Sequence, residues 1–556
     1  MFRNYIFIIN GVSSRPQIMD TIQLSVPMQD DSDKDCAALT INVIEAWLAT
    51  LPQNAIESGG AIKQFLDRIN RTTLKKCDRY EAMEQFRPIV KGICTTLTQQ
   101  YMHASTPLNE EMQPLATLNI QLITALSTGY KIAAKDAHSK IKKYKKGEKN
   151  SQLVVNTFQR SINNLCWLLL ETYRIYWPEP SNIWLDMNQI YLHAEHLNIH
   201  TALVEKCKDM ETMLSIKQSY YRALLLVVFN PYHLHKGEIA SIFERMPRWT
   251  NFVHLNKPKD ISELEDSCYI DLEKDKSPKF MYSNEGEINL EHFRIISQKD
   301  LVQILTTQIK DTEQSSSASS AVKNQQLELY KRLLKALHPR QKRSSPRIPV
   351  SEKLTVANNL SACYYFINGC KDFNPNIKLP SQDVSQILDQ QITESEQIDE
   401  ATTWNQKNQS ESGVAIFCPQ RCTMNAHVGE IVAFHNAIDD DSPWQVGVVR
   451  WIKSRPNGGM EFGIYVFADD STAVEVKAVR GESSSFNFFR AIMAPDVNPM
   501  DEKASIFVPP DIYAEGTVIL INLNDKVVHV ILQELVEKGR DFEHYSILPL
   551  HETAKL

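Results

Sequence analysis

Two groups of side chains in the C-terminal half of the chain could together bind a phosphate-bearing ligand. In the first group, Arg343 and Arg347 stand four residues apart, with further cations ahead of them at Arg340 and Lys342. A guanidinium is planar, permanently charged and carries a rigid fork of N–H donors, so it can hold phosphate oxygens and stack on a flat base. Pro346 favours an extended backbone between the two arginines. These residues predict a basic arm that binds anions and bases.

The second group lies further along the chain, at Asn408, Ser410 and Gly413 in the sequence N-Q-S-E-S-G. Asparagine and serine offer short-range hydrogen-bond donors and acceptors, and glycine lets the backbone turn tightly or approach a ligand closely. The apolar residues that begin at Val414 predict a short β-strand directly after the group. The second group therefore predicts a ligand-facing turn at the start of a strand.

In chain order the two groups spell R-x-x-x-R and then N-x-S-x-x-G. This pair of motifs resembles the PilZ domain, a six-stranded β-barrel that binds the bacterial second messenger cyclic di-GMP. The resemblance implies that the arginines lie on a flexible segment ahead of the first strand, where they clamp phosphates and stack on guanine. It also implies that the second motif is a surface turn that holds the other guanine edge. The implied ligand contacts are Arg343, Arg347, Asn408, Ser410 and Gly413, with Arg340 and Lys342 as secondary contacts.

The spacer between the two motifs is long for a compact barrel. A candidate strand begins at Lys353, and we expect an acidic insertion over about 370–405. The insertion must loop out and leave the ends of the barrel strands close together, which is permitted because each doubling of loop length costs only ~0.6 kcal/mol. Residues 379–406 contain no Lys or Arg, so this segment could compete with the ligand for the basic arm. A solvated loop is the simpler interpretation.

Composition indicates a multidomain globular protein without a strong overall charge. Of the 556 residues, 43% are hydrophobic and 23% are charged, which is ordinary for soluble domains. The formal net charge of −7 argues against nucleic-acid binding, so any anion site must be local. No stretch approaches the ~20 apolar residues of a membrane span. The ten cysteines match no metal-ligand spacing, and we expect reduced thiols in a cytoplasmic protein.

Motifs of the common enzyme classes are absent from the sequence. There is no G-x-S-x-G, no P-loop and no G-x-G-x-x-G ahead of a predicted helix, so we expect no enzymatic activity. His196 and His200 have the i, i+4 spacing of zinc ligands, but the other residues of a known zinc motif do not accompany them. We therefore predict no metal site.

Hydrophobic periodicity divides the chain into an all-α part and a β part. Over 36–250, apolar residues recur at spacings of three and four residues, which is typical of helices. After Gly413, short segments alternate between apolar and polar residues, and a strong turn signal stands at 457–459. The predicted fold class is multidomain α + β, with an N-terminal all-α bundle or array followed by a small antiparallel β-barrel and a β-rich tail. The expected divisions are a tail at 1–35, the helical domain at 36–250, a mixed connector and Ser-rich linker at 251–323, a helix and basic arm at 324–347, the PilZ-like barrel at 348–484 and a β-rich extension at 485–556.

Two questions about the ends of the chain stay open at this level. Residues 1–18 have the character of an over-extended start or a disordered tail ahead of Met19. Residues 485–556 could complete the barrel or form a second small β-domain packed on it.

The resemblance implies a bacterial cyclic di-GMP receptor or adaptor that needs no other cofactor. In this interpretation the ligand orders the arm that carries Arg343 and Arg347, and the helical domain passes the change to an unidentified protein partner. The alternative is an interaction scaffold whose barrel has lost nucleotide binding, because a fold does not by itself determine a function.

Overall fold

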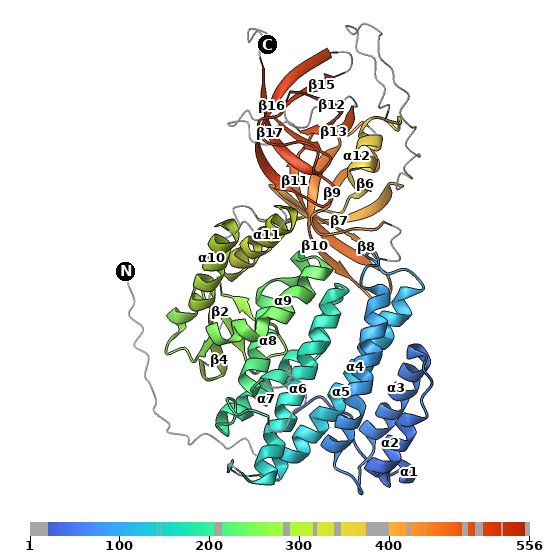
Figure 1. Ribbon diagram of the computed structural model, residues 1–556, viewed down its shortest axis with the longest axis vertical. Coiled ribbons are helices and arrows are strands. Elements are labelled where there is room, and N and C mark those ends of the chain that lie inside the picture. Colours follow the sequence, from blue (N-terminus) through green and yellow to red (C-terminus); the bar gives the residue numbers. More distant parts are fainter. Residues whose placement is uncertain are drawn as a thin grey trace, which may run out of the picture.

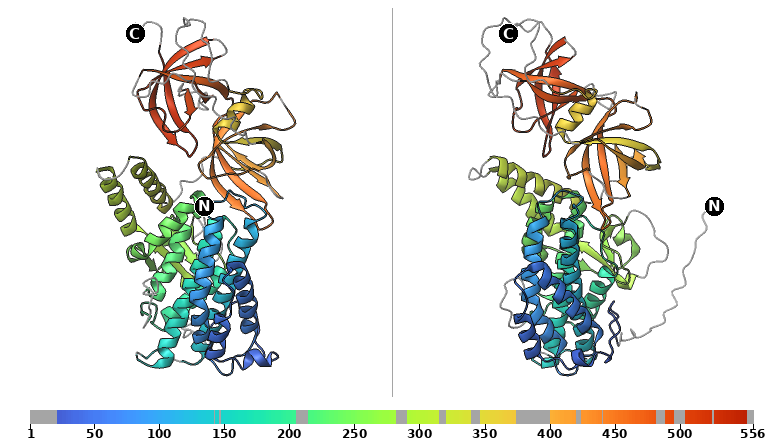
Figure 2. Two further views of the ribbon diagram at one scale, coloured as in Figure 1. Left: turned by 45° about the vertical axis from the view of Figure 1, so that its right-hand side comes forward. Right: turned by 90° about the vertical axis from the view of Figure 1, so that its right-hand side faces the viewer.

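The computed structural model describes residues 21–141, 143–145, 147–204, 214–281, 290–314, 320–338, 346–373, 400–419, 424–439, 441–480, 488–494, 504–523 and 526–550. Helices make up the N-terminal half, and two β-barrels stand beyond one end of the helical part (Figure 1). Two further views place the C-terminal barrel farthest from the helices (Figure 2). The predicted α + β class, with helices first and antiparallel barrels last, is confirmed.

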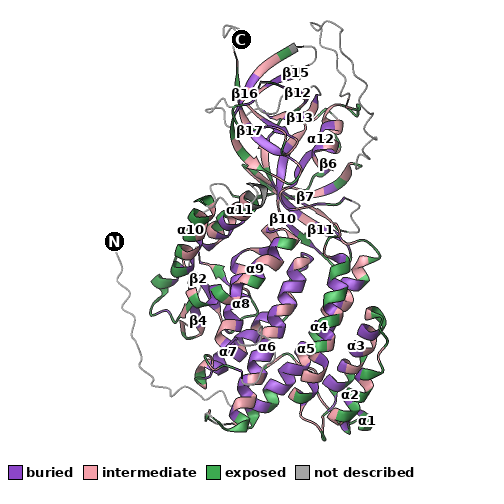
Figure 3. Ribbon diagram, viewed as in Figure 1, coloured by how far each residue is buried: buried purple, intermediate pink, exposed green. Residues whose placement is uncertain are grey.

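Two long helices form the centre of the helical part. α5 (Met112–Ser139) and α6 (Lys149–Arg174) pack along each other and carry many of its buried positions (Figure 3). Their apolar residues recur at helical spacing, so each helix presents a continuous apolar face. Around them lie α1 (Lys34–Ala37), α2 (Ile41–Ala49), α3 (Ala55–Arg71), α4 (Arg79–Tyr101), α7 (Ile183–His196), α8 (Ile216–Val228) and α9 (Lys236–Trp249). Side-chain caps fix the first residues of α3, α4 and α8. Asn54, Asp78 and Ser215 each accept a hydrogen bond from a backbone amide in the first turn of the helix that follows.

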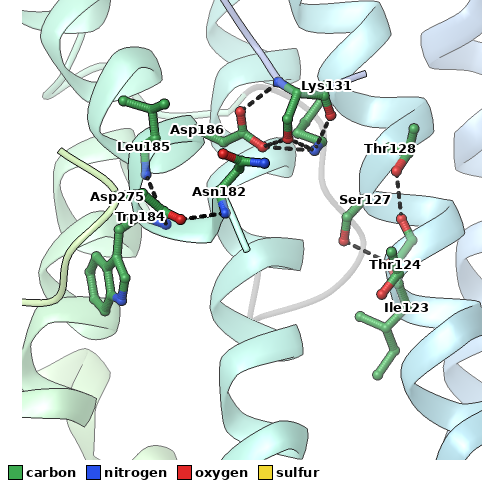
Figure 4. Close-up of polar contacts among 11 residues, drawn as sticks. Ile123, Thr124, Ser127, Thr128, Lys131, Asn182, Trp184, Leu185, Asp186 and Asp275 are labelled. Carbon is green, nitrogen blue, oxygen red and sulfur yellow. Dashed lines mark hydrogen bonds and ion pairs between the residues drawn. The ribbon is translucent and has the colours of Figure 1, made fainter. Parts of the chain in front are cut away.

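An extended segment from Thr21 to Asp33 lies against these helices, although the sequence placed it in a tail. The Ser25 amide donates to the Asp186 carboxylate at 2.7 Å, and the Lys131 ammonium contacts the same carboxylate at 2.7 Å (Figure 4). Both Lys131 and Asp186 are buried, and buried charges are tolerated only when they are paired. The segment is thereby fixed between α5 and α7. Residues 1–20 lie outside the described residues.

A small sheet and a helical hairpin connect the helical part to the barrels. β1 (His254–Asn256), β2 (Cys268–Asp271), β3 (Lys279–Phe280) and β4 (Phe293–Ser297) form the sheet in the order β1-β4-β2-β3. Asp275, which follows β2, accepts the amides of Asn182, Trp184 and Leu185 at the start of α7 (Figure 4). α10 (Lys299–Gln314) and α11 (Ser320–Leu337) follow. The segment expected as a connector thus has its own sheet and a helix, and residues 315–319 of the Ser-rich linker lie outside the described residues.

The first barrel consists of six strands with one short extension. β6 (Lys353–Asn358), β7 (Thr402–Ser410), β8 (Gly413–Cys418), β9 (Ile431–Asn436), β10 (Gln445–Ser454) and β11 (Met460–Ala468) lie in the order β7-β6-β9-β10-β11-β8, and β8 closes the barrel on β7. β5 (Ile348–Pro349) continues the line of β6 along β7. The rings of Trp404 and Phe462 fill the interior, with their centroids 4.6 Å apart.

The insertion between β6 and β7 leaves the ends of these strands together. Lys353 pairs with Asn405, as the sequence analysis required. β7 begins at Thr402, so residues 402–405 belong to the barrel and not to the expected insertion. α12 (Leu360–Ile367) follows β6, and residues 374–399, which hold most of the acidic segment, lie outside the described residues.

The C-terminal strands form a separate second barrel. β12 (Thr472–Arg480), β13 (Phe489–Ala494), β14 (Ser505–Val508), β15 (Val518–Leu523), β16 (Lys526–Lys538) and β17 (Glu543–Pro549) close in the order β12-β13-β14-β17-β16-β15. The division expected at 484 is wrong, because β12 pairs with β13 and β15 and not with a strand of the first barrel. Alternation of apolar residues predicts a strand but does not say which neighbour it pairs with.

Candidate functional site

The second motif forms a tight hairpin between β7 and β8. Ser410 pairs with Gly413, and the two residues between them make the turn. The Ser410 Oγ donates a hydrogen bond to the Gly413 carbonyl at 3.3 Å. A Cβ at Gly413 would lie 3.2 Å from the Ser410 Oγ and 3.4 Å from the Ile464 carbonyl oxygen. Glycine therefore keeps the surface beside Ser410 open for a close approach.

The short strand β5 brings the basic arm to this hairpin. Pro349 pairs with Asn408 in antiparallel register. Continued by two residues, the same register places the exposed Arg347 opposite Ser410. Neighbouring strands lie ~4.8 Å apart, so a guanidinium at this position can reach a ligand seated over the hairpin. The tertiary structure thus joins one arginine of the first motif to the Asn, Ser and Gly of the second.

The other cations of the arm remain predictions. Arg340, Lys342 and Arg343 lie outside the described residues, which stop at His338 after α11 and resume at Pro346.

A row of residues crosses the barrel surface at the level of the hairpin. Gly413 pairs with Tyr465 of β11, whose side chain is 41% exposed. Residues directly opposite each other on antiparallel strands point to the same face of the sheet. Arg347, Ser410, Gly413 and Tyr465 therefore share one face, and we call them the outer row.

Burial of the neighbouring residues shows that the outer row faces outward. Val414 and Ile464, which adjoin Gly413 and Tyr465 in sequence, are buried in the barrel interior. The sequence predicts short strands around the turn at 457–459 and does not single out Tyr465. Tyr465 lies beside the hairpin because of the register of β8 against β11. The periodicity of residues along one strand does not determine that register.

Arg450 of β10 links the outer row to the second barrel. Its guanidinium lies 5.1 Å from the ring centroid of Tyr465 and 5.7 Å from that of Phe467. The same guanidinium forms a two-point ion pair with the Glu537 carboxylate of β16, with Nη2 at 2.8 Å from Oε2. The two-point pairing and the contacts with aromatic rings together restrict the position and orientation of the guanidinium. The candidate site therefore borders the second barrel.

An apolar cluster under α12 holds the two barrels together. Its members from the first barrel include Val448 and Ala468, and those from the second include Phe507 and Phe542. At its edge the Asp541 carboxylate accepts the amide of Leu360 at 2.9 Å and that of Ile431 at 3.4 Å.

The carboxyl group of Asp541 is held in an unusual environment. Burial at the contact and the nearby Glu430 carboxylate raise the pKa of Asp541 to about 7. Both factors disfavour the charged form, and the two amides only partly offset them. The contact between the barrels therefore contains an acid that titrates near neutral pH.

The opposite end of the first barrel meets the helical part. The Ser454 amide donates to the Tyr176 carbonyl at 2.8 Å, and Ser454 pairs with Met460, which in turn pairs with Cys418. Along β8, Gly413 and Cys418 are five residues apart, a separation of about 17 Å. The hairpin therefore lies at the end of the barrel that is remote from the helices.

α11 provides a second connection to the helical part, at the start of the basic arm. The Arg332 guanidinium forms a two-point ion pair with Glu238 of α9, and Arg245 of α9 donates to the Tyr330 hydroxyl at 2.6 Å. Glu238 also accepts the His235 amide at 2.9 Å, so the pair holds the first turn of α9. The arm thus begins on a helix docked to the helical part and ends beside the hairpin.

The histidines of the helical part differ in their surroundings, because His193 and His138 are buried whereas His196 is exposed. His193 and His138 face each other with ring nitrogens 3.2 Å apart, and burial lowers the pKa of His193 to about 4. Among the described residues, no three His, Cys, Asp or Glu side chains come together as a metal site. Likewise, no helix in the described part of the chain is both long and apolar enough to cross a membrane.

Comparison with known protein families covers most of the chain in three consecutive parts. The model of the N-terminal domain of the cyclic-di-GMP receptor FimW matches residues 42–260, and that of its middle PilZ domain matches 268–409 and 387–472. This chain contains a PilZ domain. The model of the FimW C-terminal β-barrel domain matches 474–550, which agrees with a second barrel that includes β12.

The match to the PilZ family confirms the resemblance read from the motifs. The PilZ match also takes in most of the small sheet and the α10–α11 hairpin. A curated protein of Pseudomonas aeruginosa PAO1, named cyclic-di-GMP receptor FimW, is 23% identical over 584 residues, which is 95% of this chain and 94% of the relative. The helical part, the PilZ barrel and the second barrel therefore have counterparts in the same order in that protein.

Proposed function

We propose that this chain is a bacterial, cytoplasmic receptor for cyclic di-GMP, and that the ligand binds over the β7–β8 hairpin of the PilZ barrel. The observation that carries the proposal is the register of β5 on β7, which sets Arg347 beside Ser410 and Gly413. A guanidinium next to small polar groups and an open backbone suits a ligand that has both phosphates and base edges. The name of the relative from Pseudomonas aeruginosa supports the same ligand.

The basic arm supplies the second part of the proposed site. In the proposed complex, Arg343 joins Arg347 on the ligand, Arg340 and Lys342 make outer contacts, and Asn408 of β7 contributes its side-chain amide to the same site. A local cluster of this kind can bind an anion although the whole chain carries a net charge of −7.

The proposed output is a change in the helical part. The arm leaves α11, which Arg332 ties to Glu238 at the start of α9. Ligand that draws the arm onto the barrel would pull on this helix and shift the helical part between two arrangements. An unidentified protein partner then binds the rearranged helical part. The proposed role is that of a receptor, with no enzymatic step.

Isothermal titration of cyclic di-GMP into the full-length protein tests the proposal. We expect micromolar or tighter binding, because each charge-assisted hydrogen bond contributes about 1.5–3 kcal/mol. The double variant Arg343→Ala/Arg347→Ala should lose at least about a hundredfold in affinity, and Ser410→Ala a smaller factor. Lys353→Ala removes an exposed cation from β6 of the same barrel and is the matched control, with unchanged affinity expected.

The opposite result would favour a different role. A folded wild-type protein that does not bind the nucleotide would indicate an interaction scaffold with a degenerate barrel. Equal affinity in the wild type and the double variant would place the ligand away from the arm. Raising the salt concentration should weaken true phosphate binding at this exposed site.

A further inference from the structure

The outer row ends in an aromatic residue that belongs to neither motif. We propose that the ring of Tyr465 is a stacking surface for one guanine of the bound dinucleotide. This inference rests on the proposed function, because it assigns a further ligand contact to the same site.

The flank of Tyr465 that faces the hairpin is open. Its partner there is Gly413, which has no side chain, and Tyr465 is itself 41% exposed. Ser410 is the cross-strand partner of Gly413 in the hairpin and has a small side chain. A flat base can therefore lie over Gly413 with its face or edge against the Tyr465 ring and its polar edge toward Ser410.

A second row, two residues further along the strands, continues the same surface. Asn408 pairs with Ala415, Ala415 with Gly463, and Gly463 with Trp451. A Cβ at Gly463 would lie 2.1 Å from the Trp451 Nε1, so the indole lies directly on the backbone of β11. Small residues thus form the floor between the motif side chains on β7 and two aromatic side chains on β10 and β11.

The Tyr465 ring is held from the side of the second barrel. The Arg450 guanidinium lies 5.1 Å from its centroid, and the Phe467 ring meets it edge-on with centroids 5.0 Å apart. Arg450 is in turn fixed by its two-point pair with Glu537. A ring that is already positioned loses little side-chain freedom when a base stacks on it.

The two ends of the outer row offer different chemistry to one ligand. Arg347 and Tyr465 are separated by three strand spacings, or about 14 Å. The arginine end suits phosphate, and the tyrosine end suits a base, because every base has a π-face that stacks on an aromatic ring. A dinucleotide with two phosphates and two guanines can use both ends together.

The test is a titration of cyclic di-GMP into full-length protein that carries Tyr465→Ala, Tyr465→Phe or Tyr465→Leu. We expect Tyr465→Ala to raise the Kd between about fivefold and a hundredfold. Tyr465→Phe keeps the ring and should stay within about twofold of the wild type, whereas Tyr465→Leu keeps apolar area without the ring and should resemble the alanine variant. Leu548→Ala on β17, also exposed on a strand, is the matched control. Thermal melts of each variant confirm folding.

Three results would overturn the inference, and they separate it from the proposed function. If the wild type binds and Arg347→Ala weakens binding while Tyr465→Ala does not, the receptor function stands and the stacking contact is refuted. If Tyr465→Phe is as weak as Tyr465→Ala, the hydroxyl and not the ring makes the contact. If the folded wild type does not bind the dinucleotide, the proposed function fails and the stacking contact fails with it.

Discussion

The two barrels close in the same way but are joined to the rest of the molecule differently. Each surrounds an apolar interior with six antiparallel strands. The interior of the PilZ barrel is continuous with the buried core of the helical part, whereas the second barrel encloses a core of its own that includes Val476, Ile521 and Leu532. The PilZ barrel also begins with an arm and the broken strand β5–β6.

This difference shows what barrel closure does not provide. In both barrels, closure pairs the backbone hydrogen-bonding groups of the edge strands and buries apolar side chains. The candidate ligand site comes instead from Arg347 ahead of the first strand and from the outer row on the barrel surface. Continuity of the core with the helices connects the PilZ barrel directly to the helical part, whereas the described apolar residues inside the second barrel form a separate cluster.

The largest expected effect tests this continuity of the core. Phe462→Ala removes a buried ring that packs on Trp404, and should lower the free energy of unfolding by about 3–5 kcal/mol. Because the core is shared, amides of α9 should lose hydrogen-exchange protection together with those of β10 and β11. Ile521→Ala in the second barrel is the matched control and should leave α9 protected. Loss of protection confined to the PilZ barrel in Phe462→Ala would contradict the shared core.

A smaller effect concerns the acid between the barrels. The pKa of Asp541 is raised to about 7 in the folded protein by burial and by Glu430, so the folded state binds its proton more tightly than the unfolded state does. Stability should therefore fall as the pH rises from about 4 to about 7, by an amount on the order of 3 kcal/mol, and should level off on this account above about pH 8.

Asp541→Asn is the variant that checks this pH dependence. Asparagine mimics the protonated acid, so the variant should be less sensitive to pH and more stable than the wild type at pH 8. Thermal melts of both proteins from pH 5 to 8 give the comparison, and their difference isolates Asp541 from other titrating groups such as His235. Parallel curves for the two proteins would show that Asp541 does not set the pH dependence.

The smallest expected effect is that of the ion pair at the rim of the same contact. Arg450 and Glu537 are partly exposed, with side chains 37% and 22% accessible, and such pairs contribute about 0.2–1 kcal/mol. A double-mutant cycle with Arg450→Met and Glu537→Gln, read by thermal unfolding, should give a coupling energy of this size. The Lys538–Glu543 pair within β16 and β17 serves as the reference. A coupling near zero would mean that this ion pair adds nothing to the contact between the barrels.

The sequence by itself determined the order of helical and β regions and the types of the site residues. Helical spacing of apolar residues and capping by Asn54, Asp78 and Ser215 are local properties, so the helices could be predicted from neighbouring residues alone. The hairpin turn at 457–459 and the R-x-x-x-R and N-x-S-x-x-G motifs are local in the same sense.

Only the tertiary structure decided which distant residues meet. The pairing of β5 with β7 that sets Arg347 beside Ser410, the place of Tyr465 in the outer row and the pairing of β12 with the second barrel all depend on register between strands far apart in sequence. The packing of residues 21–33 on the helices likewise depends on Lys131 and Asp186, more than a hundred residues away. Apolar alternation defines the two faces of a strand but leaves its partner and its register open, because these are selected by how the whole core packs.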